Sequence, residues 1–332
     1  MGWLKRGAKH RGPARPGRTR GGAEGPVDLA GELRALASPG AAAGRALAGV
    51  RALSAEVRDP AALGLLRALE RGAETGQLAL PPLPEVVLRV RDLIQSPDLR
   101  IADLERELQL DPALATRIVG VANSPFYGSA KPAVAVGEAI VRVGLRQTSH
   151  LVLALALRSR VLRAPGHDLE VAGLWVHALA ASLVAQSLAA LLGGDPEEAA
   201  LVGLVHDVGR VAILAAQGDL ERSSRGQVRV RPEARASIAD ALHPALGAML
   251  ADAWSLAPAV VAAISHHHAA AAAPERVRPL VRTVAGADAL ARVLVQTEPP
   301  EELPALEGID PETAGAALEE AREAYRDLSK LI

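Results

Sequence analysis

The apolar residues of this chain recur at the spacing of an α-helix almost throughout, and this periodicity restricts the fold more than any other feature. Only residues 228–231 alternate apolar and charged side chains as a half-buried strand would, and that stretch is short. Aromatic residues make up 2% of the chain, so its core must consist of Ala, Leu and Val, which favour closely packed helices over sheets. The sequence therefore predicts an all-α fold.

Charge and cysteine content exclude several classes of function. The formal net charge is -1, so the whole molecule lacks the basic excess of a nucleic-acid-binding protein. The chain contains no cysteine, which excludes a disulfide scaffold, thiolate chemistry and cysteine-ligated zinc, and fits a reducing compartment. We expect a cytoplasmic protein with no specific nucleic-acid partner.

One uncharged segment, residues 171–194, is long enough to span a bilayer. Polar residues such as His177 and Gln186 interrupt it, and Ala and Gly contribute much of the remainder, so its transfer into lipid would be unfavourable. We therefore expect a buried helix of a globular core and no transmembrane segment.

Changes in composition divide the chain into successive segments. Gly and Pro punctuate the basic N-terminus, which predicts a disordered tail that makes at most weak contacts with acidic surfaces. Pro165 and Gly166 mark a boundary between two helical lobes. The predicted segments are the tail at 1–26, an N-terminal helical segment at 27–76, a first lobe at 77–164, a second lobe at 165–295, and an acidic C-terminal segment at 296–332 with a helix near 311–329.

Helical periodicity also places the elements within the two lobes. In the first lobe we expect helices from 85, at 98–109, after the capping pair Asp111-Pro112, and from 138 to 162 with a break at Gly144. In the second lobe we expect helices near 171–192, 197–216, 236–253, 257–268 and 279–295.

Imidazole and carboxylate side chains gather in the second half of the chain. Together they suit a divalent metal such as Mn, Fe or Zn. The adjacent pair His206-Asp207 would point about 100° apart on a helix, so it can serve one ion or bridge two, and the other ligands would come from neighbouring helices. The candidate ligands are His177, His206, Asp207, His243, His267 and Asp288, with His266 and His268 beside them.

Each candidate histidine also has a simpler structural explanation. His177 could be a satisfied core histidine on an apolar helix. His243, followed by proline, could lie at an ordinary helix start, and the run 266–268 could be a solvated helix end favoured by the helix dipole.

The carboxylates have such explanations too. Asp207 could cap a turn before Gly209, and Asp288 could pair with Arg282 or Arg292. The joint occurrence of histidines and carboxylates in this order nevertheless favours a shared site.

Short motifs follow one another in a distinctive order along the chain. They are Leu80-Pro81-Pro82-Leu83-Pro84, Asp111-Pro112-Ala113-Leu114, Ala122-Asn123-Ser124-Pro125, Ala139-Ile140, Gly144-Leu145, Trp175 with His177, Gly203-Leu204-Val205-His206-Asp207-Val208-Gly209, His243-Pro244 with Gly247, Trp254, Leu256 and Pro258, Ala263-Ile264 and His267-His268. This order resembles the HDOD domain, a regulatory relative of the HD phosphohydrolases, over residues 77–295. The resemblance implies two helical lobes, the second HD-like, and a role in bacterial signal transduction, mostly without demonstrated activity.

The resemblance also implies roles for single residues. The core metal ligands of catalytic HD relatives would correspond to His177, His206, Asp207 and Asp288. The further histidines of the cyclic-di-GMP phosphodiesterase branch would correspond to His243 and to His267 or His268.

The chain departs from that phosphodiesterase branch around the same residues. Arg210 stands where a lysine is usual, and residues 269–273, all alanine, replace the Gly-Tyr-Pro motif. No glutamate follows the paired histidines. The retained ligands favour a metal site, whereas the lost motifs argue against cleavage of cyclic-di-GMP.

Two functions follow. The first, which the resemblance favours, is a non-catalytic regulatory module that binds a protein partner or a nucleotide through the interface between the lobes, with Arg210 and His268 as ligand-binding residues. The alternative is a metal-dependent phosphohydrolase in which metal-activated water is the nucleophile and Asp207 is a ligand and possible proton acceptor.

Overall fold

The computed structural model describes residues 40–329, except for 79, 95, 97, 129–130 and 297–301. The tail predicted at 1–26 lies outside the described residues. Within them the structure is helical, with no strand and one isolated bridge between Leu306 and Ile309. Residues 228–231 are irregular. The predicted all-α fold is confirmed.

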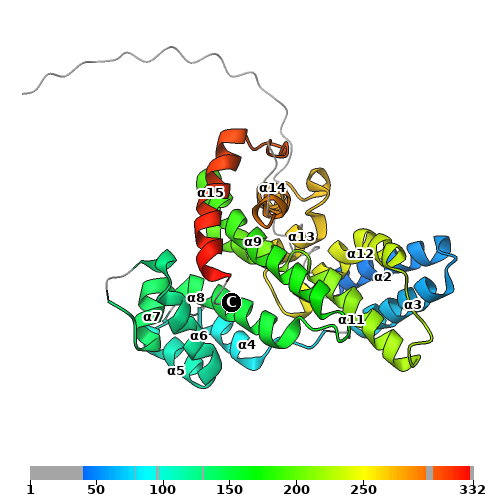
Figure 1. Cartoon of the computed structure of the whole chain (residues 1–332), viewed down its shortest axis with the longest axis horizontal. Coiled ribbons are helices and arrows are strands. Elements are labelled where there is room, and N and C mark those ends of the chain that lie inside the picture. The colour runs from blue at the N-terminus through cyan, green and yellow to red at the C-terminus, as the bar shows by residue number, and fades with distance from the viewer. Residues whose placement is uncertain are drawn as a thin grey trace, which may run out of the picture.

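Two helices precede the first lobe in sequence but pack against the second. Helix α2 (Ala41–Glu56) contacts α12 (Pro232–Ala253), and α3 (Pro60–Thr75) contacts α11 (Val208–Ser223). They lie together at one end of the molecule (Figure 1). The Asp59 carboxylate accepts the free N–H groups of Ala61 and Ala62, as a capping residue should.

The first lobe is a compact group of short helices. The predicted helix at 98–109 starts later, at Ile101, and the predicted break at Gly144 is present with a φ of 93°. The last α-helix continues into a π-helix just before the lobe boundary. The elements are α4 (Glu85–Ile94), α5 (Ile101–Gln109), α6 (Pro112–Ala122), the 3-10 turn η1 (Pro125–Tyr127), α7 (Val136–Val143), α8 (Leu145–Ala156) and the π-helix η2 (Leu157–Val161).

The second lobe surrounds one long apolar helix, α9. Helix α9 packs against α10, α14 and α15, so that the C-terminal α15 lies along it (Figure 1). The elements of the lobe are α9 (Asp168–Leu192), α10 (Pro196–Val205), α11, α12, α13 (Pro258–His266), η3 (Ala270–Ala272), α14 (Arg278–Leu294) and α15 (Pro311–Leu328).

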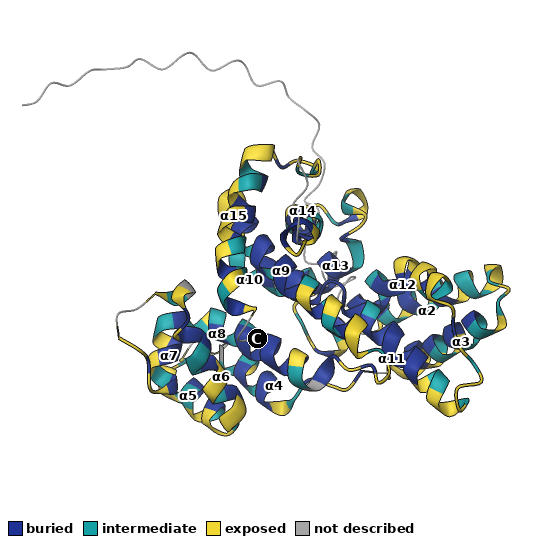
Figure 2. Cartoon of the chain, in the orientation of Figure 1, coloured by how far each residue is buried: buried dark blue, intermediate teal, exposed yellow. Residues whose placement is uncertain are grey.

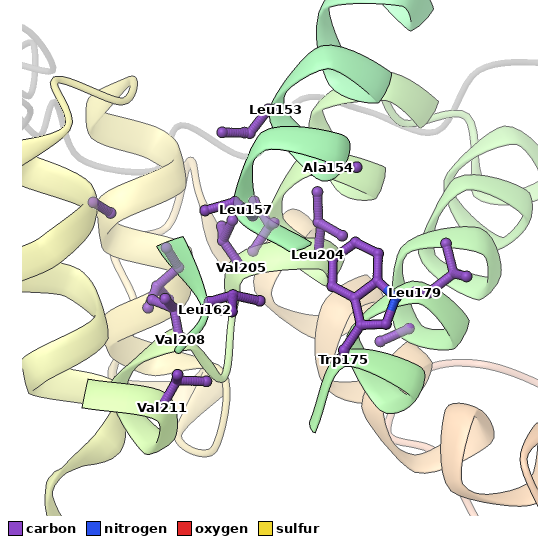
Figure 3. Packing of buried hydrophobic residues seen from close by; sticks show 14 of the residues in the cluster. Leu153, Ala154, Leu157, Leu162, Trp175, Leu179, Leu204, Val205, Val208 and Val211 are labelled. Carbon is purple, nitrogen blue, oxygen red and sulfur yellow. The ribbon is translucent and has the colours of Figure 1, made fainter. Parts of the chain in front are cut away.

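A continuous core joins the two lobes. Leu157 of the first lobe projects toward Val205 of α10, and Leu204 of α10 lies beside Trp175 of α9, all within one buried apolar cluster (Figure 3). The buried faces of the helices form one interior across both lobes (Figure 2). Burial of large side chains on this scale stabilises the lobe arrangement, because each contributes about 1.5–3 kcal/mol.

In the part of the chain that the structure describes, two helical stretches have the length and apolar composition of membrane spans, Asp168–Leu192 and Pro196–Ser223. Val136–Val143 and Leu145–Ser159 would pass the same test together, but they are bent by 110°. Of the most apolar windows of the two stretches, 61% and 89% of the residues are buried against the rest of the protein. Packing inside a globular core accounts for this apolarity without a bilayer, because buried helices need no polar face. This supports the expectation of no transmembrane segment, which stays a prediction.

That prediction has a direct test. Because both stretches are buried, the protein should stay in the supernatant when a detergent-free lysate is centrifuged at high speed. Recovery in the pellet, with release by detergent but not by alkaline carbonate, would contradict it.

Candidate metal centre

The sequence predicted one helix at 197–216, but the structure has two helices with a break at His206-Asp207. This break positions the site. Helix α10 ends at Val205 and α11 begins at Val208. Asp207 has φ −99° and ψ 10°, and its side chain makes no capping hydrogen bond to α11. The carboxylate therefore turns away from the helix end and faces the imidazoles.

Glycines in the same motif allow the neighbouring helices to approach. A Cβ at Gly203 would lie 2.6 Å from the Ala181 carbonyl oxygen on α9, and a Cβ at Gly209 would lie 2.1 Å from the His243 carbonyl oxygen on α12. The first contact brings α9 next to His206, and the second brings α12 next to Asp207.

The first group of possible ligands lies where α9, α10 and α14 meet. The Nε2 atom of His177 lies 2.9 Å from Oδ1 of Asp288. The same oxygen lies 3.6 Å from Nε2 of His206, which is completely buried. These three residues could hold one metal ion.

The second group comes from α12 and the end of α13. The Nε2 atom of His243 lies 3.1 Å from Nε2 of His267 and 3.1 Å from Nε2 of His268. His243 and His267 are buried, whereas His268 is exposed. These three imidazoles could hold a second ion.

Asp207 lies between the two groups. Its Oδ2 is 3.7 Å from His206 Nε2, and its Oδ1 is 3.2 Å from His243 Nε2 and 4.0 Å from His267 Nε2. One carboxylate oxygen thus faces each group. Asp207 could therefore contribute a carboxylate oxygen to an ion held by either group.

Backbone carbonyls fix the orientation of the buried rings. The Nδ1 atoms of His206, His243 and His267 lie 2.7–2.8 Å from the carbonyl oxygens of Gly203, Ala239 and Ile264. In a neutral ring Nδ1 must then donate to the carbonyl, so that Nε2 carries the free lone pair. Metal-binding histidines commonly have this second hydrogen bond.

The donor set fits a divalent metal ion. Ligands bound about 2.1 Å from a tetrahedral ion are about 3.4 Å apart, and the distances from His206 Nε2 to the two carboxylates, 3.6 and 3.7 Å, match this spacing. His206 Nε2 is buried and makes no hydrogen bond among the described residues. The facing Nε2 atoms of His243 and His267 need a proton or a cation between them.

Electrostatics keep the carboxylates charged and most of the rings neutral. Burial by itself would raise the pKa of Asp207, but His206 and Arg210 outweigh it and lower that pKa to about 2. Burial lowers the pKa of His243 to about 4 and that of His267 well below its ordinary value. Metal binding requires these states, a carboxylate and neutral imidazoles.

His206 and Asp288 form the strongly coupled part of the site. Burial would lower the pKa of His206, but Asp207 and Asp288 raise it above its ordinary value. Burial would likewise raise the pKa of Asp288, but hydrogen bonding to His177, the nearby ring of His206 and the charge of Arg292 hold it far below the usual range.

Each carboxylate is also paired with an arginine three or four residues later in the chain. Arg210 Nε donates to Asp207 Oδ1 at 3.1 Å, and Arg292 Nη2 lies 2.8 and 2.6 Å from the two oxygens of Asp288. Arg292 confirms one of the partners considered for Asp288. Its side chain is 55% exposed, so it can release the carboxylate to a metal ion without being buried elsewhere.

Two sequence expectations about the histidines need correction. His243-Pro244 does not begin a helix, because Pro244 lies inside α12. Nor is the run 266–268 simply a solvated helix end, because His267 is 1% exposed and only His268 is exposed to solvent.

A scan against protein families matches the HDOD domain over residues 80–270. The chain belongs to the HDOD family. A Treponema pallidum (strain Nichols) protein named "Uncharacterized protein" is 29% identical over 231 residues, which cover 68% of this chain and 44% of that relative. The chain thus spans less than half the length of this relative.

Solved structures of low sequence identity share the fold. A Shewanella amazonensis SB2B structure named "Putative metal-dependent phosphohydrolase" has a TM-score of 0.61 at 21% identity and covers 80% of this chain and 100% of that chain. The structure of an HDOD domain protein with unknown function from Geobacter sulfurreducens has a TM-score of 0.55 at 22% identity and covers 86% of this chain and 94% of that chain. A Marinobacter aquaeolei VT8 structure named "Putative signal transduction protein" has a TM-score of 0.57 at 23% identity and covers 76% of this chain and 60% of that chain.

The sequence analysis of this HDOD domain missed the role of two glycines in positioning the site. It named Gly203 and Gly209 as motif residues but gave them no role, although their lack of a Cβ allows the helix contacts. A glycine on each side of a His-Asp pair was the available signal.

Proposed function

We propose that this HDOD protein is a cytoplasmic regulatory module whose second lobe holds a divalent metal ion and which acts by binding a protein or nucleotide rather than by catalysis. The convergence of His206, Asp207 and His243 with fixed ring orientations carries the metal assignment. A bound ion would supply positive charge between buried lone pairs and carboxylates, and so would offset the cost of their desolvation.

The surroundings of the ligands support a regulatory rather than a catalytic role. His206 and His243 are 0% exposed and Asp207 is 8% exposed, so an ion fits between them far better than a phosphodiester does. After His268 the chain continues through alanines, 269–273, which have no polar side chains and of which Ala270–Ala272 form the 3-10 turn η3. Few groups are therefore available to hold a substrate.

Metal binding should stabilise the fold by mass action. Adding Mn or Fe to chelator-treated protein should raise the melting temperature. At a metal concentration one hundred times Kd, the free energy of unfolding should increase by about 2.7 kcal/mol. His206→Ala with Asp207→Ala should abolish the rise while circular dichroism retains the helical signal. Asp207→Asn, which keeps the side-chain size, should also reduce it.

The control is a variant outside the ligand set. Asp240→Ala removes the other carboxylate bonded to Arg210, at 2.9 Å, and should leave the metal response unchanged. The metal assignment fails if wild type shows no rise with any of Mn, Fe or Zn, or if the double variant responds as wild type does.

The adjacency of Asp207 to the histidines favours phosphohydrolase activity as the second candidate function. In a hydrolase the ion would activate water, and Asp207 would accept a proton. We expect no cleavage of cyclic-di-GMP, because residues 269–273 lack the Gly-Tyr-Pro motif and Arg210 replaces the usual lysine. Turnover of a phosphodiester that disappears in the double variant would overturn the regulatory proposal.

A further inference from the structure

A basic cavity lies at the boundary between the lobes, away from the histidines. Its volume is about 770 Å³, and its walls come from α6, the π-helix η2 with the residues after it, and the first turns of α9. Arg117, Arg158 and Arg163 line it, whereas Asp168 is its one acidic lining residue among the described part of the chain. The wall charges therefore favour an anion.

The arginines of this cavity are not used by the fold. Among the described residues Arg117 and Arg158 have neither an acidic partner nor a hydrogen bond, and both are exposed. Arg163 donates only to the Ser159 carbonyl oxygen, which leaves most of its guanidinium free. Unpaired arginines gathered around one hollow are suited to phosphate oxygens, which a guanidinium binds in a bidentate manner.

An apolar recess adjoins the basic cavity. It measures about 250 Å³ and shares Arg117, Ser159 and Arg163 with the larger cavity, while Leu114 and Leu155 provide its apolar wall and Asp111 lies on its edge. Binding sites for small molecules combine such an apolar recess with a few polar groups, and the volume of the larger cavity is in their usual range.

Part of the cavity wall comes from the π-helix η2. Between Leu157 and Val161 the helix widens, and the Leu162 N–H bonds to the Leu157 carbonyl oxygen. Arg158 and Ser159 lie within this turn, whereas Arg117 comes from α6 and Arg163 follows η2. Single π-helical turns are frequent at functional sites.

We propose that this cavity binds a phosphorylated small molecule of nucleotide size, with its phosphates against Arg117, Arg158 and Arg163 and its apolar part in the recess lined by Leu114 and Leu155. The biological role of this ligand rests on the proposed regulatory function, because the ligand is the molecule that the module would sense. The binding itself depends only on the cavity. A ligand there would contact both lobes and so could fix their arrangement.

The test uses the full chain in EDTA, so that the metal centre does not contribute. ATP and inorganic pyrophosphate serve as phosphate-bearing probes and adenosine as the probe without phosphate, with binding measured by calorimetry and by melting temperature. ATP should bind and raise the melting temperature, and pyrophosphate should bind more weakly. Adenosine at the same concentration should have no measurable effect.

Matched variants locate the binding. Arg117→Gln with Arg158→Gln should weaken ATP at least about tenfold, because each lost charge-assisted hydrogen bond contributes about 1.5–3 kcal/mol. Arg229→Gln removes an exposed arginine that does not line the cavity and should leave the affinity unchanged. His206→Ala with Asp207→Ala should also retain ATP binding, so failure of the metal proposal is separable from failure of this one.

Three results would overturn the proposal. One is the absence of binding by both phosphate probes up to about 1 mM, which corresponds to a weak free energy of about -4 kcal/mol. Another is an equal loss in Arg229→Gln and in the cavity variant, which would indicate non-specific attraction. The third is loss only in the His206/Asp207 variant, which would place the phosphate at the metal centre.

Discussion

Adding one methyl group at Gly209 is expected to disrupt the second lobe. In Gly209→Ala the new Cβ would lie 2.1 Å from the His243 carbonyl oxygen and 2.8 Å from the Gly247 nitrogen, both backbone atoms. Neither atom can move without separating α11 from α12. We expect a loss of about 3 kcal/mol or more in the free energy of unfolding, at the upper end for overpacked cores. Urea unfolding of the purified protein measures this loss.

Gly120→Ala is the matched control for this change. Gly120 lies inside α6, and a Cβ there would meet no atom within 4 Å. Since alanine favours a helix over glycine by about 1 kcal/mol, this variant should be at least as stable as wild type. Equal stability of the two variants would show that the α11–α12 contact tolerates a Cβ and that Gly209 does not set the position of His243.

Removal of the Asp207 carboxylate is the second change with a large expected effect. Asp207→Ala leaves Arg210 without its buried partner, so that only the exposed Asp240 remains to it, and leaves His243 and His267 facing each other without this carboxylate. Breaking a buried charge pair on one side costs about 3–5 kcal/mol, because the remaining charge stays desolvated. Urea unfolding of metal-free protein should show a loss of this size.

The comparison variant, Asp240→Ala, tests the same arginine from its exposed side. Asp240 bonds to Arg210 at 2.9 Å, but its side chain is 69% exposed. Exposed ion pairs contribute less than about 1 kcal/mol, so the loss should be small. A similar loss in both variants would mean that Arg210 requires any carboxylate, and that the buried position of Asp207 has no special weight.

The sequence predicted the fold and the candidate ligand set because both depend on patterns within the chain. Helical periodicity predicts helices directly. The resemblance to catalytic HD relatives implies that His177, His206 and Asp288 correspond to their core metal ligands. The break between α10 and α11 was not predictable in this way. Residues around His206-Asp207 are apolar and helix-compatible, so no local pattern marks the break. The break lies beside Gly209, where α11 packs against the backbone of α12.

The burial of the histidines was equally outside the reach of sequence. His243 and His267 lie in the core, because α12 continues through Pro244 and carries His243 inward. Tertiary packing decides such burial and leaves no local pattern. The pairing of Asp288 with Arg292 rather than Arg282, in contrast, follows from helical spacing, because Arg292 is four residues after Asp288 on α14.

The packing of α15 on α9 has a consequence for the synthesis of the protein. Translation adds roughly 5–20 residues per second, so the ribosome completes α9 (Asp168–Leu192) several seconds before it begins α15 (Pro311–Leu328). During that interval one side of a helix that is uncharged after its first turn has no cover in the nascent chain. The growing polypeptide should therefore be a preferred client of ribosome-associated chaperones until its last helix emerges.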